Sequence, residues 1–242
     1  MKTIQRILCL SFFQFAFCIY GHSQDWPNLG RYRGANDSLK NKKITAVFMG
    51  NSITDSWIRE SPEFFGSNDF VDRGISGQTS PQMLLRFRAD VINLHPTAVV
   101  IECGTNDIAG NTGPSTIEMI EDNIMSMAEL AKANHIKVIL GSVLPSNHIG
   151  WRPEVQPADK IIALNVWIRD YAAKNHFAYI NYYDALVDDQ KGMKSEYSPD
   201  GVHPNKAGYS VMEKLAEPVI KKTVRPPPHG LTLAGKIKGM YG

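Results

Sequence analysis

Short apolar runs alternate with longer amphipathic stretches along most of this chain. The apolar runs are rich in β-branched residues and nearly continuous; four of them cover residues 44–49, 97–103, 137–143 and 177–181, and a weaker one covers 69–72. Strands that are buried on both faces show this pattern, because neither face needs polar side chains. We therefore predict five short strands at these positions.

Helical stretches separate these runs, at residues 81–94, 115–134, 157–175 and 206–222. The first begins at a proline, which is favoured in the first turn of a helix. The second begins with polar residues and carries acidic side chains early, as the helix dipole favours. Strands that alternate with helices form βαβ units. The predicted fold class is therefore α/β, a three-layer α/β/α sandwich around a central, mostly parallel five-stranded sheet.

The two ends of the chain differ from the region between them. Residues 1–23 combine a basic start, an apolar run and small residues before the end, which predicts a signal peptide cleaved after Ser23 and export to the periplasm or the outside of the cell. An uncleaved membrane anchor is the alternative; a lipoprotein signal is disfavoured because Phe17 precedes Cys18. Residues 24–222 form the predicted domain, and a proline-rich tail of unassigned role covers 223–242.

The charge balance indicates no nucleic-acid partner. The whole chain has a formal net charge of +2, from 26 basic and 24 acidic side chains. Two of the basic residues, Lys2 and Arg6, lie in the signal segment, so removing it leaves 24 basic against 24 acidic side chains. A balanced chain without a basic stripe is not typical of nucleic-acid binding. After signal removal we expect no stable membrane insertion, and nothing in the sequence indicates an oligomeric state.

Cysteine usage indicates neither a disulfide nor a metal site. Two of the three cysteines, Cys9 and Cys18, lie in the signal segment. Cys103 remains alone inside the apolar run 97–103, and we interpret it as a small core residue. No metal and no cofactor are therefore expected.

Polar, glycine-rich segments follow three of the predicted strands, at residues 50–52, 74–79 and 104–107. Ligands bind to parallel α/β sheets at the carboxyl ends of the strands. These three loops should therefore meet at one edge of the sheet and form the site. The glycines of 74–79 fit neither the Walker nor the dinucleotide motif, so a nucleotide is not expected there.

Ser52 and the segment from Asp200 to His203 are the candidates for catalysis. Ser52 lies where a strand leads into a helix, and a serine there is either a helix cap or, given a general base, a nucleophile. His203 is the candidate base, because Asp200 can hold one imidazole nitrogen while the other faces the serine. A local turn and a pair of metal ligands are the alternatives. The surroundings match neither Gly-x-Ser-x-Gly nor Ser-x-x-Lys.

Two further groups are candidates for binding. Asn106 offers a side-chain amide and Gly77 an unhindered backbone N–H, which together suit an oxyanion, although both residue types are also common in ordinary turns. Trp151 and Arg152 lie in the segment 144–153 after the fourth strand. Trp151 offers either a stacking face for a sugar ring or an anchor for the loop.

Four blocks of the sequence resemble the SGNH/GDSL hydrolase superfamily, in the branch of platelet-activating-factor acetylhydrolase-like proteins and bacterial carbohydrate esterases. The blocks are residues 47–54, 73–79, 104–107 and 200–204, and the resemblance covers about 44–222. It implies the flavodoxin-like fold of that superfamily. Asn51 stands where the family usually has aspartate, which puts in doubt any ionic contact made there.

The resemblance also implies the role of each site residue. Ser52 is the nucleophile, His203 the general base and acid, and Asp200 the carboxylate that orients His203. The N–H groups of Ser52 and Gly77 and the side chain of Asn106 form the oxyanion hole. The implied function is a secreted serine esterase that removes a short acyl group, most simply acetyl, from a small-molecule or polysaccharide ester. The alternatives are a lysophospholipase or thioesterase, and a non-catalytic carbohydrate-binding protein.

Overall fold

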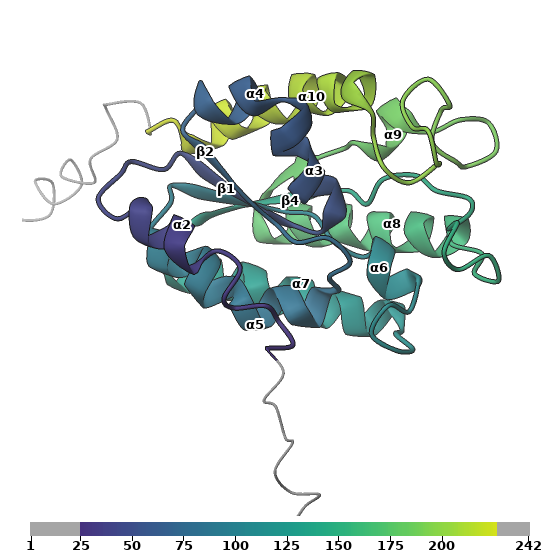
Figure 1. Cartoon of the computed structure of the whole chain (residues 1–242), viewed down its shortest axis with the longest axis horizontal. Coiled ribbons are helices and arrows are strands. Elements are labelled where there is room, and N and C mark those ends of the chain that lie inside the picture. The colour runs from purple at the N-terminus through teal and green to yellow at the C-terminus, as the bar shows by residue number, and fades with distance from the viewer. Residues whose placement is uncertain (1–24, 227–242) are drawn as a thin grey trace, which may run out of the picture.

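A parallel sheet forms the centre of the molecule. The structure is a computed structural model, and it describes residues 25–226. Five strands pair in the order β2-β1-β3-β4-β5, and every pair is parallel (Figure 1). The strands are β1 (Ala46–Gly50), β2 (Phe70–Gly74), β3 (Ala98–Ile101), β4 (Lys137–Gly141) and β5 (Ala178–Ile180). The predicted fold class is confirmed, with a sheet that is parallel throughout.

Helices cover both faces of the sheet (Figure 1). One face carries α5 (Ser80–Asp90), α7 (Ile117–Ala133) and α8 (Ala158–Asn175). The other carries α3 (Ser52–Glu60), α4 (Pro62–Gly66) and α10 (Lys206–Val224). Shorter elements join them: α2 (Arg33–Ser38), η1 (Ile92–Leu94), α6 (Thr105–Ile108) and α9 (Tyr183–Leu186).

Alternate side chains of each strand face two separate apolar layers. In β1, Met49 faces the layer beneath α5, α7 and α8, whereas Phe48 faces the layer beneath α3 and α10. The second layer is largely aromatic, and Phe48 meets Trp57 of α3 edge to face with 5.4 Å between ring centroids. Burial of Trp57 contributes on the order of 3 kcal/mol. It therefore fixes α3, whose first residue is Ser52.

Helix ends follow local capping chemistry. The predicted helix 81–94 is observed as α5, which opens with a capping box between Thr79 and Gln82 and ends at Asp90. The chain then tightens into η1, and His95, the residue after it, adopts a left-handed conformation with φ 50°. The helix predicted at 115–134 is observed as α7, and Thr116 caps it by accepting from the N–H of Met119 at 3.3 Å.

An N-terminal strap, residues 25–38, crosses the loop that follows β2. The side-chain amides of Gln78 and Gln82 donate to the carbonyls of Pro27 and Trp26, each at 2.8 Å. The hydroxyl of Tyr32 donates to the carbonyl of Gly74 at the end of β2. The sequence pattern did not predict this contact between the strap and a polar loop of the sheet edge.

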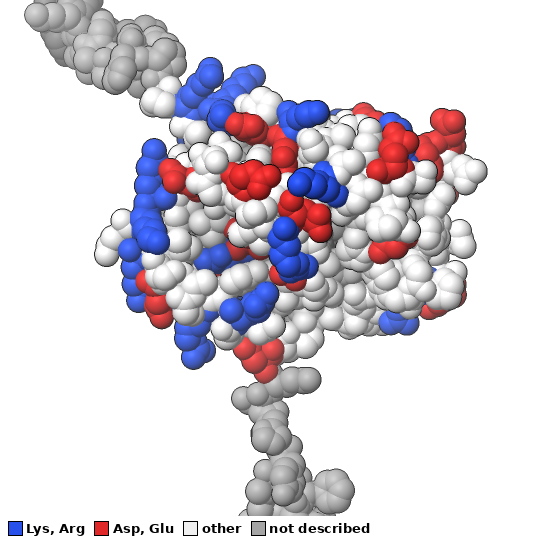
Figure 2. Space-filling model, turned by 45° about the horizontal axis from the view of Figure 1, so that its top comes forward, with Lys and Arg blue, Asp and Glu red and all other residues white. Residues whose placement is uncertain are grey.

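The described residues 25–226 contain no helix long and apolar enough to cross a membrane. The predicted signal peptide lies outside them, as does the tail beyond residue 226. On the face shown in Figure 2, basic and acidic side chains lie interspersed. α10 runs to Val224, two residues beyond the predicted end of the helix.

Candidate active site

The turn between β1 and α3 has room for nothing larger than glycine at its first position. A Cβ on Gly50 would lie 1.9 Å from Oγ1 of Thr54, so a side chain there would displace the helix start. Asn51 follows and caps α3, with its Oδ1 accepting from the N–H of Ile53 at 2.9 Å. Ser52 is therefore held as the first residue of the helix, where free N–H groups favour negative charge.

A chain of two hydrogen bonds joins the three residues predicted for catalysis. Ser52 Oγ lies 2.9 Å from Nε2 of His203. On the other side of the imidazole ring, Nδ1 of His203 lies 2.7 Å from Oδ2 of Asp200. With the Nδ1 proton held by the carboxylate, Nε2 carries a free lone pair toward the serine. This arrangement can take the proton of Ser52.

The loop before α10 holds Asp200 in its ionised form. Burial would raise the pKa of Asp200, but hydrogen bonds from the backbone and ring of His203 and from the N–H of Val202 outweigh it and lower that pKa to about 2. Oδ1 accepts both backbone bonds, at 2.8 Å from His203 and 2.9 Å from Val202. Gly201 makes the turn with φ 75°, and the ring of His148 packs where its Cβ would stand.

Contacts between α10 and α3 set the distance from His203 to Ser52. The hydroxyl of Tyr209 on α10 donates to the carbonyl of Ile53 at 2.7 Å, within a fully buried environment. The indole N–H of Trp57 donates to Glu213 at 3.1 Å. Both bonds join the helix that begins at Ser52 to the helix that follows the histidine loop. These bonds therefore hold Ser52 and His203 close together although they are far apart in the sequence.

The loops of the predicted oxyanion donors meet beside this turn. The amide of Asn106 donates to the carbonyl of Gln78 at 2.9 Å, which leaves its second N–H for another acceptor. Gly77 has φ 80° and open space where a Cβ would stand. The N–H of Ile75 donates to the carbonyl of Gly50 at 3.2 Å, so the same loop is attached to the strand that leads to Ser52. All three predicted loops converge on one edge of the sheet.

Asp107 joins two of these loops and was not singled out in the sequence. Both of its carboxylate oxygens accept from the N–H of Ser80, at 2.9 and 3.0 Å, and Oδ1 also accepts from the Ser80 hydroxyl at 2.6 Å. Burial raises the pKa of Asp107 to about 6, although the bonds from Ser80 oppose this. The residue next to Asn106 is therefore tied to the first turn of α5.

Trp151 lies beside His203, with 6.0 Å between the ring centroids and a tilt of 32°. Its indole N–H donates to Asn111 at 3.0 Å, and Asn111 in turn donates to the carbonyl of Gly77 at 3.2 Å. With 43% of its surface exposed, Trp151 remains accessible to solvent beside His203. Arg152 instead donates to the carbonyl of Gly110 at 3.2 Å and supports the loop after β3.

Two buried ionisable groups lie close to the site. Burial raises the pKa of Glu102 to about 8, and the charge of Asp107 adds to the effect. Neither carboxyl oxygen of Glu102 has a hydrogen-bond partner among the described residues. Cys103 is also buried, which raises its thiol pKa, so it stays a neutral core residue as expected.

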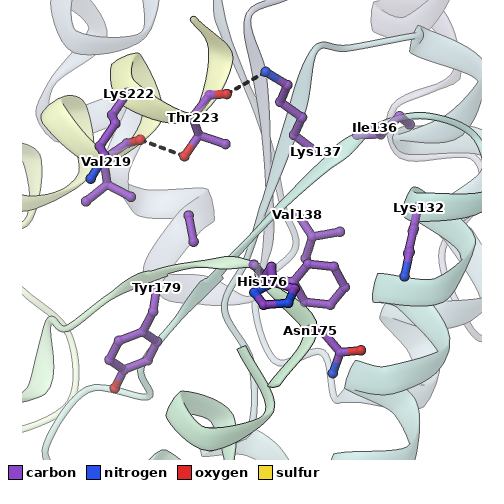
Figure 3. Close-up of a pocket in the computed structure, with 12 residues that line it drawn as sticks. Lys132, Ile136, Lys137, Val138, Asn175, His176, Tyr179, Val219, Lys222 and Thr223 are labelled. Carbon is purple, nitrogen blue, oxygen red and sulfur yellow. Dashed lines mark hydrogen bonds between the residues drawn. The ribbon is translucent and has the colours of Figure 1, made fainter. Parts of the chain in front are cut away.

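A pocket of about 690 Å³ lies at the opposite edge of the sheet (Figure 3). Its walls come from the starts of β4 and β5 and the last turns of α7, α8 and α10, including Lys137, Tyr179 and Lys222. The residues of the candidate site stand instead at the carboxyl ends of the strands. Within residues 25–226, no group of three or more His, Cys, Asp or Glu side chains could hold a metal ion.

Comparison with known proteins gives a consistent result. The model of a family described as GDSL-like Lipase/Acylhydrolase matches residues 48–211. The esterase TesA of Pseudomonas aeruginosa is 32% identical over 152 residues, which span 62% of this chain and 69% of that protein. An acylhydrolase structure from Bacteroides fragilis is 50% identical, with a TM-score of 0.81 over 84% of this chain and 100% of that chain. Axe2, an acetylxylan esterase from Geobacillus stearothermophilus, is 18% identical, with a TM-score of 0.59 over 72% of this chain and 93% of that chain, and shares the fold alone.

Proposed function

The chain belongs to the GDSL-like lipase/acylhydrolase family, and from that premise we propose that it is an exported serine esterase that removes short acyl groups, foremost acetyl, from carbohydrates. The observation that carries the chemistry is the hydrogen-bonded series from Ser52 through His203 to Asp200, at 2.9 and 2.7 Å. These three hydrogen-bonded residues supply a nucleophile, a general base and a carboxylate that orients the base.

In the first half of the proposed reaction, Ser52 Oγ attacks the ester carbonyl carbon. His203 Nε2 takes the hydroxyl proton, and the resulting imidazolium is stabilised by Asp200. The carbonyl oxygen becomes an oxyanion, which accepts hydrogen bonds from the N–H groups of Ser52 and Gly77 and from the amide of Asn106. When the tetrahedral intermediate collapses, the sugar hydroxyl leaves with the proton from His203. The acyl group remains esterified to Ser52.

The second half repeats these steps with water. His203 takes a proton from a water molecule, whose oxygen attacks the acyl carbon, and the same donors stabilise the new oxyanion. Collapse returns the proton to Ser52 Oγ and releases the carboxylic acid. Each oxyanion donor is worth roughly 3 kcal/mol in the transition state. No step requires a metal ion or a cofactor.

The carbohydrate part of the proposal rests on Trp151. Its ring is partly exposed and lies next to His203, which protonates the leaving group in the proposed reaction. An aromatic ring suits the apolar side of a sugar. The predicted signal peptide adds support, because it would carry the enzyme to polymeric sugar esters outside the cytoplasm. The acyl chains of the alternative substrates, lysophospholipids and long-chain thioesters, offer no ring to stack on Trp151.

Kinetics with matched esters test the proposal. Acetate release from acetylated xylo-oligosaccharides and hydrolysis of p-nitrophenyl acetate should greatly exceed hydrolysis of p-nitrophenyl palmitate or a lysophospholipid. Ser52→Ala should lower kcat by at least about 10³-fold, whereas Ser126→Ala on α7 should leave it unchanged. A fluorophosphonate probe should label the wild type at Ser52. An active Ser52→Ala variant would refute the chemistry, and a preference for palmitoyl esters would refute the substrate.

A further inference from the structure

Arg86 is a fully buried charged residue. It lies in the middle of α5 and none of its surface is exposed. Burial lowers the pKa of its guanidinium, while the charge and hydrogen bond of Asp90 oppose that change. Removing a charged group from water costs several kcal/mol, which must be offset by specific contacts. The contacts that Arg86 makes are therefore informative.

Its guanidinium donates to three separate segments. Nε donates to the side-chain oxygen of Gln78 at 2.6 Å. Nη2 donates to the carbonyl of Gly50 at 2.9 Å. Nη1 pairs with Asp90, one turn later on α5, at 3.0 Å. Only the last of these contacts lies within the helix itself.

The other two contacts flank the proposed catalytic groups. Gly50 ends β1, two residues before Ser52, and its carbonyl also accepts from the loop after β2. Gln78 follows Gly77 directly, and its backbone carbonyl accepts from the side chain of Asn106. One side chain thus connects the strand that carries the nucleophile with the loop of one oxyanion donor, and a further hydrogen bond reaches the second donor.

We propose that Arg86 is a positioning residue, which sets the distance between the Ser52 nucleophile and the oxyanion donors Gly77 and Asn106. The proposal rests on the function proposed above. It adds that the geometry of the oxyanion hole depends on a side chain that never touches the substrate. A shift of about 1 Å in such a site can cost about 10²-fold in rate.

The fixed shape of the guanidinium explains why arginine serves here. Its donors point in divergent directions from one rigid plane, so it can bond to three acceptors that come from different elements. A lysine ammonium carries three donors on one atom and cannot reach all three acceptors at once. Arg86→Lys keeps the positive charge beside Asp90, so it separates the charge from the geometry.

The test compares two buried arginines. Arg73 on β2 is 4% exposed. Its side chain donates to Asn36 of the strap at 2.9 Å and to the carbonyl of Asp72, and it has no hydrogen bond to Gly50 or Gln78. We expect Arg86→Met and Arg86→Lys to lower kcat about 10- to 100-fold with little change in KM. Arg73→Met should lower the melting temperature but keep kcat within about 3-fold.

A boronic acid forms a tetrahedral adduct with the serine, so we measure the affinity of each variant for it as well as the kinetics. Both measurements use a temperature at which circular dichroism shows that each variant is folded. The affinity should fall in the Arg86 variants by the same factor as kcat. An unchanged kcat in Arg86→Met, or an equal loss in Arg73→Met, would overturn the proposal. An inactive wild type or an active Ser52→Ala variant would instead overturn the proposed function, and this proposal with it.

A second pair of variants covers the case in which the Arg86 variants do not fold. Gln78→Glu keeps an oxygen acceptor for Arg86, whereas Gln78→Ala removes it. We expect Gln78→Ala to lose about 10-fold or more in kcat and Gln78→Glu to retain most of it. Equal values of kcat in the two variants would count against the positioning role.

Discussion

Asn51 shows how one side chain can serve the turn without taking part in the chemistry. It is 1% exposed, and its Oδ1 caps α3 at the N–H of Ile53. Its Nδ2 has no hydrogen-bond partner among the described residues. The structural requirement at this position is thus an acceptor oxygen, which the aspartate usual in relatives also provides.

Two substitutions of Asn51 separate the effect of the acceptor oxygen from that of the amide group. Asn51→Ala should lower the free energy of unfolding by about 1 kcal/mol, the usual cost of a lost helix cap. Asn51→Asp keeps the acceptor at a helix N-terminus, so its kcat should stay within about 3-fold of wild type. Urea unfolding and ester kinetics measure the two effects. A loss of stability in Asn51→Asp as large as in Asn51→Ala would show that the amide group itself is required.

We expect Glu102 to make the stability of the molecule depend on pH. Burial raises its pKa to about 8, from an ordinary value of 4.5. Between these values the unfolded chain releases the proton while the folded chain keeps it. The free energy of unfolding should therefore fall by about 1.4 kcal/mol per pH unit over this window. Below it, both states hold the proton and the contribution of Glu102 to stability is fully present.

Glu102→Gln removes this dependence. Asp72 and Asp107 also have raised pKa values, about 7 and about 6, so the wild-type slope has several sources. The difference between wild type and Glu102→Gln isolates one of them. Urea unfolding at pH 5, 6.5 and 8 should show the variant gaining stability relative to wild type as pH rises. Parallel curves would mean that Glu102 ionises normally in the folded protein.

At the scale of elements, the sequence predicted what apolar patterns determine. Four strands were found because their runs are apolar on both faces, whereas the weaker run at 69–72 marked β2, which contains Asp72 and Arg73. Three long helices ended within three residues of the prediction. The burial of Arg86 could not be predicted, because along α5 it looks like the exposed Arg88. Leu85, beside it, is 56% exposed. Here hydrogen-bond acceptors from other elements, which no local pattern records, determine which side chain is buried.

The position of the strap at residues 25–38 also depends on hydrogen bonds to other elements, which the sequence pattern did not predict. The strap precedes the family-matched region at 48–211, yet Tyr32 bonds the end of β2 and lies 3.3 Å from Asp72. Tyr32→Phe should lower the free energy of unfolding by about 1 kcal/mol through the lost hydrogen bond. Tyr171→Phe on α8 is the matched control. Urea denaturation measures the free energy of unfolding of both variants. An equally small loss of stability in Tyr32→Phe and Tyr171→Phe would contradict the prediction.

At the scale of the whole molecule, the sheet order explains how the site is assembled. β1 lies inside the sheet between β2 and β3, so the loops after all three strands are neighbours at one edge. α10 covers the same face as α3 and brings His203 to Ser52 across 151 positions of sequence. The sequence predicted which residues to look for at this edge. The distances between them depend on packing between helices, which the sequence pattern does not contain.

Trp151 lies at this edge of the sheet and is partly exposed to solvent. Its removal should separate the chemistry from sugar recognition. In the proposed function, an acetylated oligosaccharide stacks on the partly exposed indole next to His203, whereas the small ester p-nitrophenyl acetate needs only the catalytic groups. Trp151→Ala should therefore raise KM for acetylated xylo-oligosaccharides about 2- to 12-fold, the worth of one stacking contact. The kcat for p-nitrophenyl acetate should stay within about 3-fold of the wild-type value. Trp151 also donates a hydrogen bond to Asn111, which donates to the carbonyl of Gly77. Trp151→Phe keeps a stacking face but not that bond, so it should rescue KM for the sugar ester. If Trp151→Ala instead lowered kcat equally for both esters, the tryptophan would support the oxyanion loop rather than bind sugar.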